Sequence, residues 1–224
     1  MCRGLCFIFI VCVWLSQARA DDYSLNCKSI SDYGRLRDDY PIIIVLEGEG
    51  NLSADDKSFI AAEITIQTKK IEQLIGLKIN PTSDCFALRI LNQEGLFAVS
   101  GLENASAVTI DGIIYFSFED LNSELIRHEV FHAMVFKLLS NKLPWWIEEG
   151  LAQLLSVELD MGKASKPKTK IEMKYRDARL RVSRLVNSCG FKAFGSYFKL
   201  IEQGNTERYS FNKIFNEECS NEKP

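Results

Sequence analysis

EDLNSELIRHEVFHAMVFKLLSNK, residues 119–142, contains both histidines of the 224-residue chain. Apolar residues recur through it three and four positions apart, which predicts an amphipathic helix. His128 and His132 are four positions apart, so both imidazoles share one face and can bind a single metal ion from consecutive turns. Glu129 is rotated by about 100° from His128. That position suits a general base for a metal-activated water better than a ligand.

A catalytic zinc ion needs three protein ligands and one open position. The chain has no third histidine, so the third ligand must be a carboxylate or a thiolate. Glu148 and Glu149 are the candidates, in a second predicted helix over residues 145–159. Glu149 is favoured, because Gly150 after it allows a close helix approach and Gln153 could hydrogen-bond a ligating histidine. The alternative is that both glutamates are solvated surface acids.

The combination of HEVFH with LPWWIEEGLAQ resembles the gluzincin metallopeptidases, and within them the peptidase MA-like group. Members of that group have HExxH followed by P-x-W-x-x-E-G-x-A. The resemblance covers about residues 105–160. It implies that Zn²⁺ is bound by His128, His132 and Glu149, with Glu129 as the base. The family often has an acidic residue at the position of Gln153. With a glutamine there, the histidine that it contacts would be a less basic zinc ligand.

The segments before residues 119–142 alternate between strand and helix patterns. Residues 41–50 form a β-branched run, and residues 53–77 have helical periodicity with a capping Ser53 and a terminal Gly76. Residues 85–101 predict two short strands around a Gly-containing turn. Residues 105–118 predict a hairpin whose turn is Asp111-Gly112.

The predicted fold is α+β and zincin-like. A small mixed sheet with an antiparallel hairpin lies over the HExxH helix, and the C-terminal half is helical, with two or three helices over residues 173–219. This gives one metallopeptidase domain over residues 41–224. Its core is of ordinary size for such a length.

The N-terminus predicts a signal peptide over residues 1–20. Arg3 precedes an apolar run that is too short to span a bilayer, and Ala18-Arg19-Ala20 fits cleavage after Ala20. The alternative is an uncleaved anchor. A polar lead-in over residues 21–40 follows. The protein is therefore expected to be secreted or periplasmic, with no membrane attachment after cleavage.

Four cysteines remain beyond the predicted signal peptide, an even number that favours two disulfides in an exported chain. We expect them to pair within each half of the chain, as Cys27–Cys85 and Cys189–Cys219. The alternative, a role as zinc ligands, is disfavoured because the chain has no CxxC pair.

Without the signal peptide the chain has 25 basic and 30 acidic residues, a balance that does not favour nucleic acid as a partner. The lysine-rich residues 161–170 predict an exposed loop, or a basic lip that attracts substrate. Three arginines could bind a substrate carboxylate: Arg176, Arg179 and Arg181. The alternative is that they form the solvent-exposed face of an amphipathic helix.

These patterns predict a monomeric zinc metallopeptidase that hydrolyses peptide bonds in peptide or protein substrates. Tyr175, Tyr197 and Tyr209 are candidates for stabilising the oxyanion, although each is also explained as a half-buried aromatic residue. Two alternatives remain. One is a catalytically inactive zincin-like binding module, and the other is an exported structural domain without metal.

Overall fold

The computed structural model describes residues 43–46, 53–79, 86–103, 105–117, 121–140, 143–156 and 169–219. Several predicted features lie outside these residues: the signal peptide, the polar lead-in, Cys27, Cys85 and most of the lysine-rich segment 161–170. Among the helices that it does describe, none combines the length and the apolar character needed to cross a bilayer.

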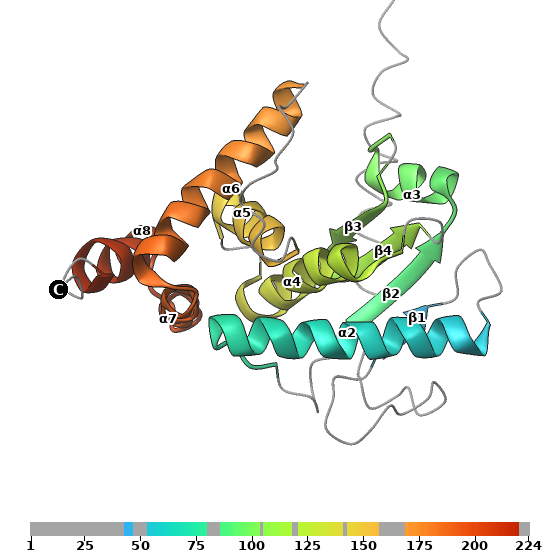
Figure 1. The fold of residues 1–224 in the computed structure, drawn as a ribbon, viewed down its shortest axis with the longest axis horizontal. Coiled ribbons are helices and arrows are strands. Elements are labelled where there is room, and N and C mark those ends of the chain that lie inside the picture. Colours follow the sequence, from blue (N-terminus) through green and yellow to red (C-terminus); the bar gives the residue numbers. More distant parts are fainter. Residues whose placement is uncertain are drawn as a thin grey trace, which may run out of the picture.

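Four short strands form a mixed sheet in the order β1-β2-β4-β3 (Figure 1). Parallel pairing joins β1 to β2 and β2 to β4, whereas β3 is antiparallel to β4. The strands are β1 (Ile43–Leu46), β2 (Phe86–Leu91), β3 (Ala107–Ile110) and β4 (Ile113–Ser117). The sheet is therefore mixed, as the sequence predicts.

The hairpin between β3 and β4 is confirmed. Asp111 and Gly112 have φ values of 51° and 75°, and a tight two-residue turn of this kind requires positive φ at both positions. Gly112 is also a close contact point, because an added Cβ would lie 2.5 Å from Cδ1 of Phe136. Phe136 belongs to helix α4 (Ser123–Leu139), so the turn is pressed against this helix.

Alternate residues of the central strands face two cores. One face joins the main core through Phe86, Leu88, Ile90, Ile114 and Phe116. The other face forms a smaller cluster from Ala87, Ile113 and Tyr115 with Leu96. Every residue of β4 is buried, as expected for a strand that is covered on both faces.

Helix α2 (Ala54–Ile75) begins and ends where the sequence predicts. Ser53 forms a capping box with Asp56, and Gly76 ends the helix at φ 80°. Its buried side packs in the main core, and the helix lies beside α4 (Figure 1).

The prediction of a second short strand within residues 85–101 is wrong. Residues 93–100 form helix α3 (Gln93–Ser100). The side chain of Asn92 accepts a hydrogen bond from the backbone of Gly95, and Gly101 ends the helix at φ 68°. These two caps stabilise a short helix whose one buried residue is Leu96.

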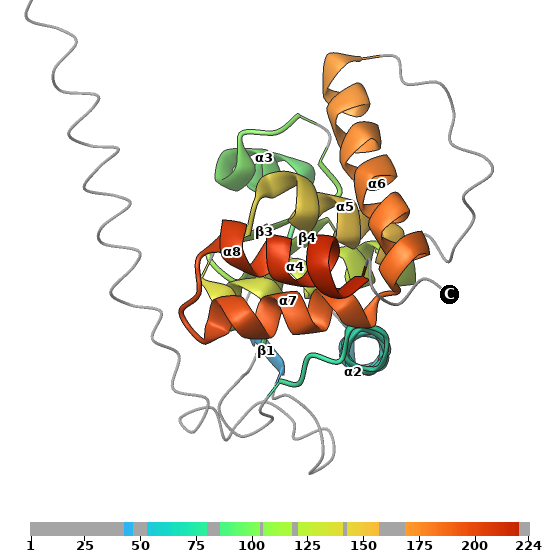
Figure 2. The same cartoon turned by 90° about the vertical axis from the view of Figure 1, so that its left-hand side faces the viewer.

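The C-terminal half is helical, as predicted. Its elements are α5 (Trp145–Ser156), α6 (Lys170–Cys189), α7 (Lys192–Glu202), α8 (Glu207–Phe211) and the π-helical segment η3 (Asn212–Glu218). Helices α7 and α8 lie side by side, and α7 packs against the end of α2 (Figure 2). The small sheet and the many helices confirm the α+β class.

A disulfide joins Cys189 at the end of α6 to Cys219 after η3, with 5.4 Å between the Cα atoms. This is the predicted pairing of the C-terminal half. The bond anchors the end of α6 to the last described turn, beside an aromatic cluster that includes Phe194, Tyr197 and Phe215.

Candidate metal centre

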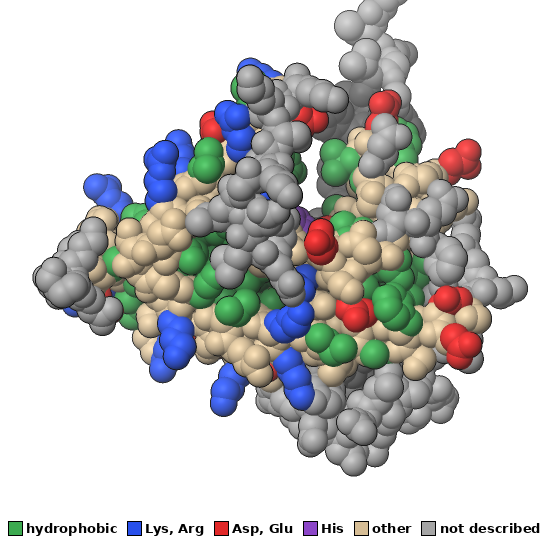
Figure 3. Space-filling model, in the orientation of Figure 1, with side chains coloured by type: hydrophobic (Ala, Val, Ile, Leu, Met, Phe, Trp, Pro, Cys, Tyr) green, Lys and Arg blue, Asp and Glu red, His purple; other side chains and the backbone are tan. Residues whose placement is uncertain are grey.

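Helix α4 presents the two histidines. Asn122 caps it by accepting a hydrogen bond from the backbone N–H of Leu125 at 2.9 Å. The exposed fractions are 20% for the His128 side chain and 16% for that of His132. Both imidazoles are therefore packed by protein but reachable from solvent. Figure 3 shows a small patch of histidine surface visible on this face of the molecule.

Helix α5 presents the third candidate ligand. The carbonyl oxygen of Pro144 accepts hydrogen bonds from the backbone N–H groups of Ile147 and Glu148, which starts the helix just before Glu149. A Cβ at Gly150 would lie 2.6 Å from the backbone oxygen of Ala178. The close approach expected at Gly150 is thus made, and its partner is α6.

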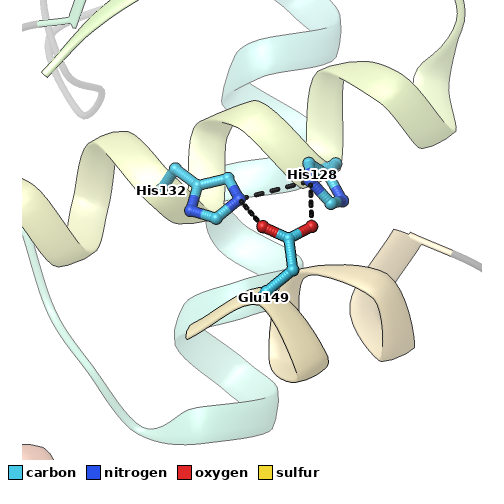
Figure 4. A group of neighbouring side chains, drawn as sticks. All are labelled: His128, His132 and Glu149. Atoms are coloured by element: carbon cyan, nitrogen blue, oxygen red, sulfur yellow. Dashed lines mark hydrogen bonds and ion pairs between the residues drawn. The ribbon is translucent and has the colours of Figure 1, made fainter. Parts of the chain in front are cut away.

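Three side chains from α4 and α5 converge on one point (Figure 4). Nε2 of His128 is 3.2 Å from Nε2 of His132 and 3.3 Å from Oε1 of Glu149. Nε2 of His132 is 3.5 Å from Oε2 of Glu149. One ligand atom from each residue can be chosen so that all lie within 4.8 Å, and the group could hold a metal ion.

These separations can be compared with those in a tetrahedral zinc site. Ligand distances of 2.0–2.1 Å place neighbouring ligand atoms about 3.3–3.4 Å apart. The contacts among His128, His132 and Glu149 span 3.2–3.5 Å, with the two histidines approaching different oxygens of the Glu149 carboxylate. The contacts are close to these separations, and the group could hold a metal ion.

Three carboxylates surround the two imidazoles. Burial alone would lower the pKa of His132, but the hydrogen bond with Glu148 and the nearby carboxylate charges outweigh it. The pKa of His132 is therefore raised. In the metal-free protein a proton on His132 offsets part of this excess negative charge, and a divalent cation would offset it more fully.

The Glu149 carboxylate is affected in the opposite direction. Its burial raises the pKa, but the hydrogen bond with His128, the charge on both imidazoles and a hydrogen bond with Gln153 outweigh burial. The pKa of Glu149 is therefore lowered. This carboxyl group is held in its ionised form, which is the form that binds metal.

The structure assigns the contact to the histidine differently from the sequence analysis. Gln153 was expected to hydrogen-bond a ligating histidine, but its side chain bonds Glu149 instead. The partner of His132 is Glu148, whose Oε1 lies 2.7 Å from Nδ1 of the ring. Glu148 was the alternative candidate for the third ligand. The direction of its side chain at the first turn of α5 could not be derived from spacing alone.

Glu129 lies next to the ligands and has a partner of its own. Thr109 on β3 donates from Oγ1 to Oε2 of Glu129 at 2.7 Å, and the same hydroxyl lies 3.1 Å from the Glu129 backbone oxygen. Glu129 is only 5% exposed, and a buried carboxylate needs such a donor. Thr109 was not predicted from the sequence, where its signal is a polar residue within an apolar strand.

The structure separates the three candidate tyrosines. Burial raises the pKa of Tyr175, and the charges of Glu149 and Glu129 raise it further. The phenol is therefore within electrostatic reach of the cluster. Tyr197 is fully buried beside Glu207, with 3.3 Å between its hydroxyl and Oε1. Tyr209 is 53% exposed on α8.

The three candidate arginines all lie on α6. Nε of Arg176 is 4.0 Å from Oδ1 of Asp177, and the guanidinium of Arg181 lies 5.9 Å from the centre of the Trp146 ring. Arg179 also has a partner. A role for them in binding a substrate carboxylate stays a prediction.

No family model, no curated protein and no solved structure matches this chain.

Proposed function

We propose that this protein is an exported zinc metallopeptidase of the gluzincin kind, with a zincin-like fold. The observation that carries the proposal is the convergence of two Nε2 atoms and one carboxylate at separations of 3.2–3.5 Å, together with the separately held carboxylate of Glu129. Two imidazoles and one carboxylate are the ligands of many catalytic zinc sites that keep an open position.

His128, His132 and Glu149 would hold the ion. Imidazole and carboxylate donors in this number suit zinc better than magnesium or calcium, which prefer oxygen ligands. Bound there, zinc would lower the pKa of a water ligand to about 7 and polarise the carbonyl group of a scissile bond.

Glu129 would act as the general base. It accepts a proton from the attacking water and returns it to the amine that leaves when the peptide bond breaks. The hydrogen bond from Thr109 occupies Oε2, which leaves Oε1 of the same carboxylate for the proton. The charge of Glu129 acts on His132, so the base lies within reach of the ligand cluster.

Tyr175 is the described tyrosine best placed to stabilise the oxyanion. Its ring packs edge-on against Trp145, with 5.2 Å between the centroids. Trp145 lies one helical turn before Glu149 on α5, so the contact holds Tyr175 on the ligand side of that helix. A phenol O–H donated to the developing negative charge would stabilise the transition state.

The first prediction concerns the base. Glu129→Gln should retain one zinc ion per chain and lower kcat by a factor of about 10²–10⁴, the usual contribution of general base catalysis. The test is metal analysis of protein purified without chelator or histidine tag, together with hydrolysis of a peptide library. Glu202→Gln, an exposed carboxylate at the end of α7, is the matched control and should leave both quantities unchanged.

Two results would contradict the proposal. Stoichiometric zinc with no turnover on any peptide would indicate an inactive binding module. An absence of metal from the wild-type protein, even after incubation with zinc, would indicate a structural domain.

A further inference from the structure

The shortest polar contact among the two histidines, Glu148 and Glu149 does not involve Glu149, the proposed third metal ligand. Oε1 of Glu148 lies 2.7 Å from Nδ1 of His132, whereas Glu149 approaches the two imidazoles at 3.3 and 3.5 Å. His132 is therefore engaged at both ring nitrogens. Its Nε2 faces the other ligands and its Nδ1 faces Glu148.

This arrangement determines where the proton of a neutral His132 belongs. An ionised carboxylate only accepts hydrogen bonds, so Glu148 requires the proton on Nδ1. The lone pair of Nε2 then points toward His128 and Glu149, as a metal ligand requires. Glu148 thus selects the tautomer and fixes the rotation of the ring.

The position of Glu148 is itself fixed by the start of α5. Its backbone N–H donates to the carbonyl oxygen of Pro144 at 3.2 Å, and its side chain is 20% exposed. The Gln153 side chain, in contrast, hydrogen-bonds Glu149. Consecutive residues of one helical turn therefore contact different parts of the cluster.

We propose that Glu148 is a positioning residue for the metal site: it orients His132 through Nδ1, while Glu149 binds the ion. The inference rests on the metal site of the proposed function but not on peptidase activity. Outer carboxylate partners of ligating histidines typically contribute a factor of 10–100 in metal affinity. Removal of the Glu148 side chain should weaken zinc binding by this factor.

The test is a chelator-competition titration with zinc of the full chain and of four variants. Glu148→Ala should raise the zinc Kd about 10–100-fold. Glu148→Gln should raise it less, because an amide oxygen still accepts from Nδ1 without supplying charge. Glu149→Ala should lose high-affinity binding. Glu202→Gln is the control and should match the wild type.

A second readout distinguishes positioning from general structural damage. The chain has only two histidines, so an NMR spectrum that correlates imidazole nitrogens with ring protons reports each tautomer directly. In the zinc-loaded wild type, His132 should carry its proton on Nδ1 with a strongly hydrogen-bonded signal. Glu148→Ala should lose that signal, whereas the His128 signals should persist.

Three outcomes would overturn the inference. In the first, both Glu148 variants bind zinc within twofold of the wild type. In the second, the cobalt-substituted Glu148→Gln variant shows a changed coordination number, which would make Glu148 a ligand. In the third, the wild type binds no zinc, which would remove the proposed function as well; the first two outcomes leave it intact.

Discussion

At the scale of single residues, the site depends on polar contacts between elements that are distant in sequence. The HExxH pattern predicts His128, His132 and Glu129 from local spacing alone, because a helix places positions i and i+4 on one face. The partners Glu148 and Thr109 could not be predicted in the same way. Their contacts depend on how α5 and β3 pack against α4.

The hydrogen bond from Thr109 to Glu129 predicts a loss of stability when the hydroxyl group is removed. Thr109→Val keeps the shape of the side chain but removes the donor from a carboxylate that is only 5% exposed. Loss of one partner of a buried charged group costs about 1–3 kcal/mol or more. Urea unfolding should show a loss of this size in the free energy of unfolding.

The same substitution should lower kcat more than it changes KM, because the base loses its orientation and not its contact with substrate. Thr109→Ser retains a hydroxyl and should recover most of both quantities. Equal stability and equal kcat in Thr109→Val and the wild type would show that the hydrogen bond has no role.

At the scale of elements, helix ends could be predicted where the capping residues are strong local signals. Helix α2 was predicted to its ends because Ser53 and Gly76 are strong local signals. Helix α3 was missed because its apolar composition suggested a strand. The caps at Asn92 and Gly101 could have revealed it, but an eight-residue segment has too few turns for a clear helical period.

Gly150 provides a test at this scale. Gly150→Ala would place a Cβ 2.6 Å from the backbone oxygen of Ala178 and 2.6 Å from Cγ2 of Val182. Overpacking of this kind costs about 1–3 kcal/mol, so thermal unfolding should occur at a lower temperature. The displacement of α5 should also weaken zinc binding, since Glu149 precedes Gly150.

Gly95→Ala in α3 is the contrasting variant. Its nearest contacts would be side-chain atoms of Asn92 and Leu91 at 3.2 and 3.3 Å, which can adjust. It should change stability less than Gly150→Ala and leave zinc binding unchanged. An equal effect of the two variants would mean that the α5–α6 contact is not specially close.

At the scale of the whole molecule, the candidate metal site joins helix α4 to the helical C-terminal half. The α+β class and the order of elements other than α3 could be predicted from the sequence. The choice of Tyr175 over Tyr197 and Tyr209 could not, because it depends on which helix lies over α5. The pairing of Cys189 with Cys219 was predicted because both lie in the C-terminal half of the chain, and it is confirmed.

The electrostatics of the cluster predict a pH dependence for the metal-free protein. The pKa of His132 is raised from its ordinary 6.5, so its stabilising contribution is complete below pH 6.5 and is lost as the pH rises through the folded-state pKa. The pKa of Glu149 is lowered from 4.5, so its contribution is complete above pH 4.5 and is lost at more acidic pH. Both are fully present between these values.

The unfolding free energy of the metal-free protein should therefore fall as the pH rises above 6.5, measured by urea titration with a chelator present. Zinc-loaded protein should show the opposite trend across mildly acidic pH, because protons compete with the ion for the imidazoles. The same pH dependence with and without zinc would contradict this account.

The partial exposure of the two histidines, 20% and 16% of each side chain, has a consequence for how the site is filled. An ion can reach the imidazoles through solvent without unfolding of the helices. We therefore expect exchange of the ion with its surroundings to be faster than global unfolding. Occupancy would then follow the free zinc concentration of the compartment in which the protein resides, and not the supply available while the chain folds.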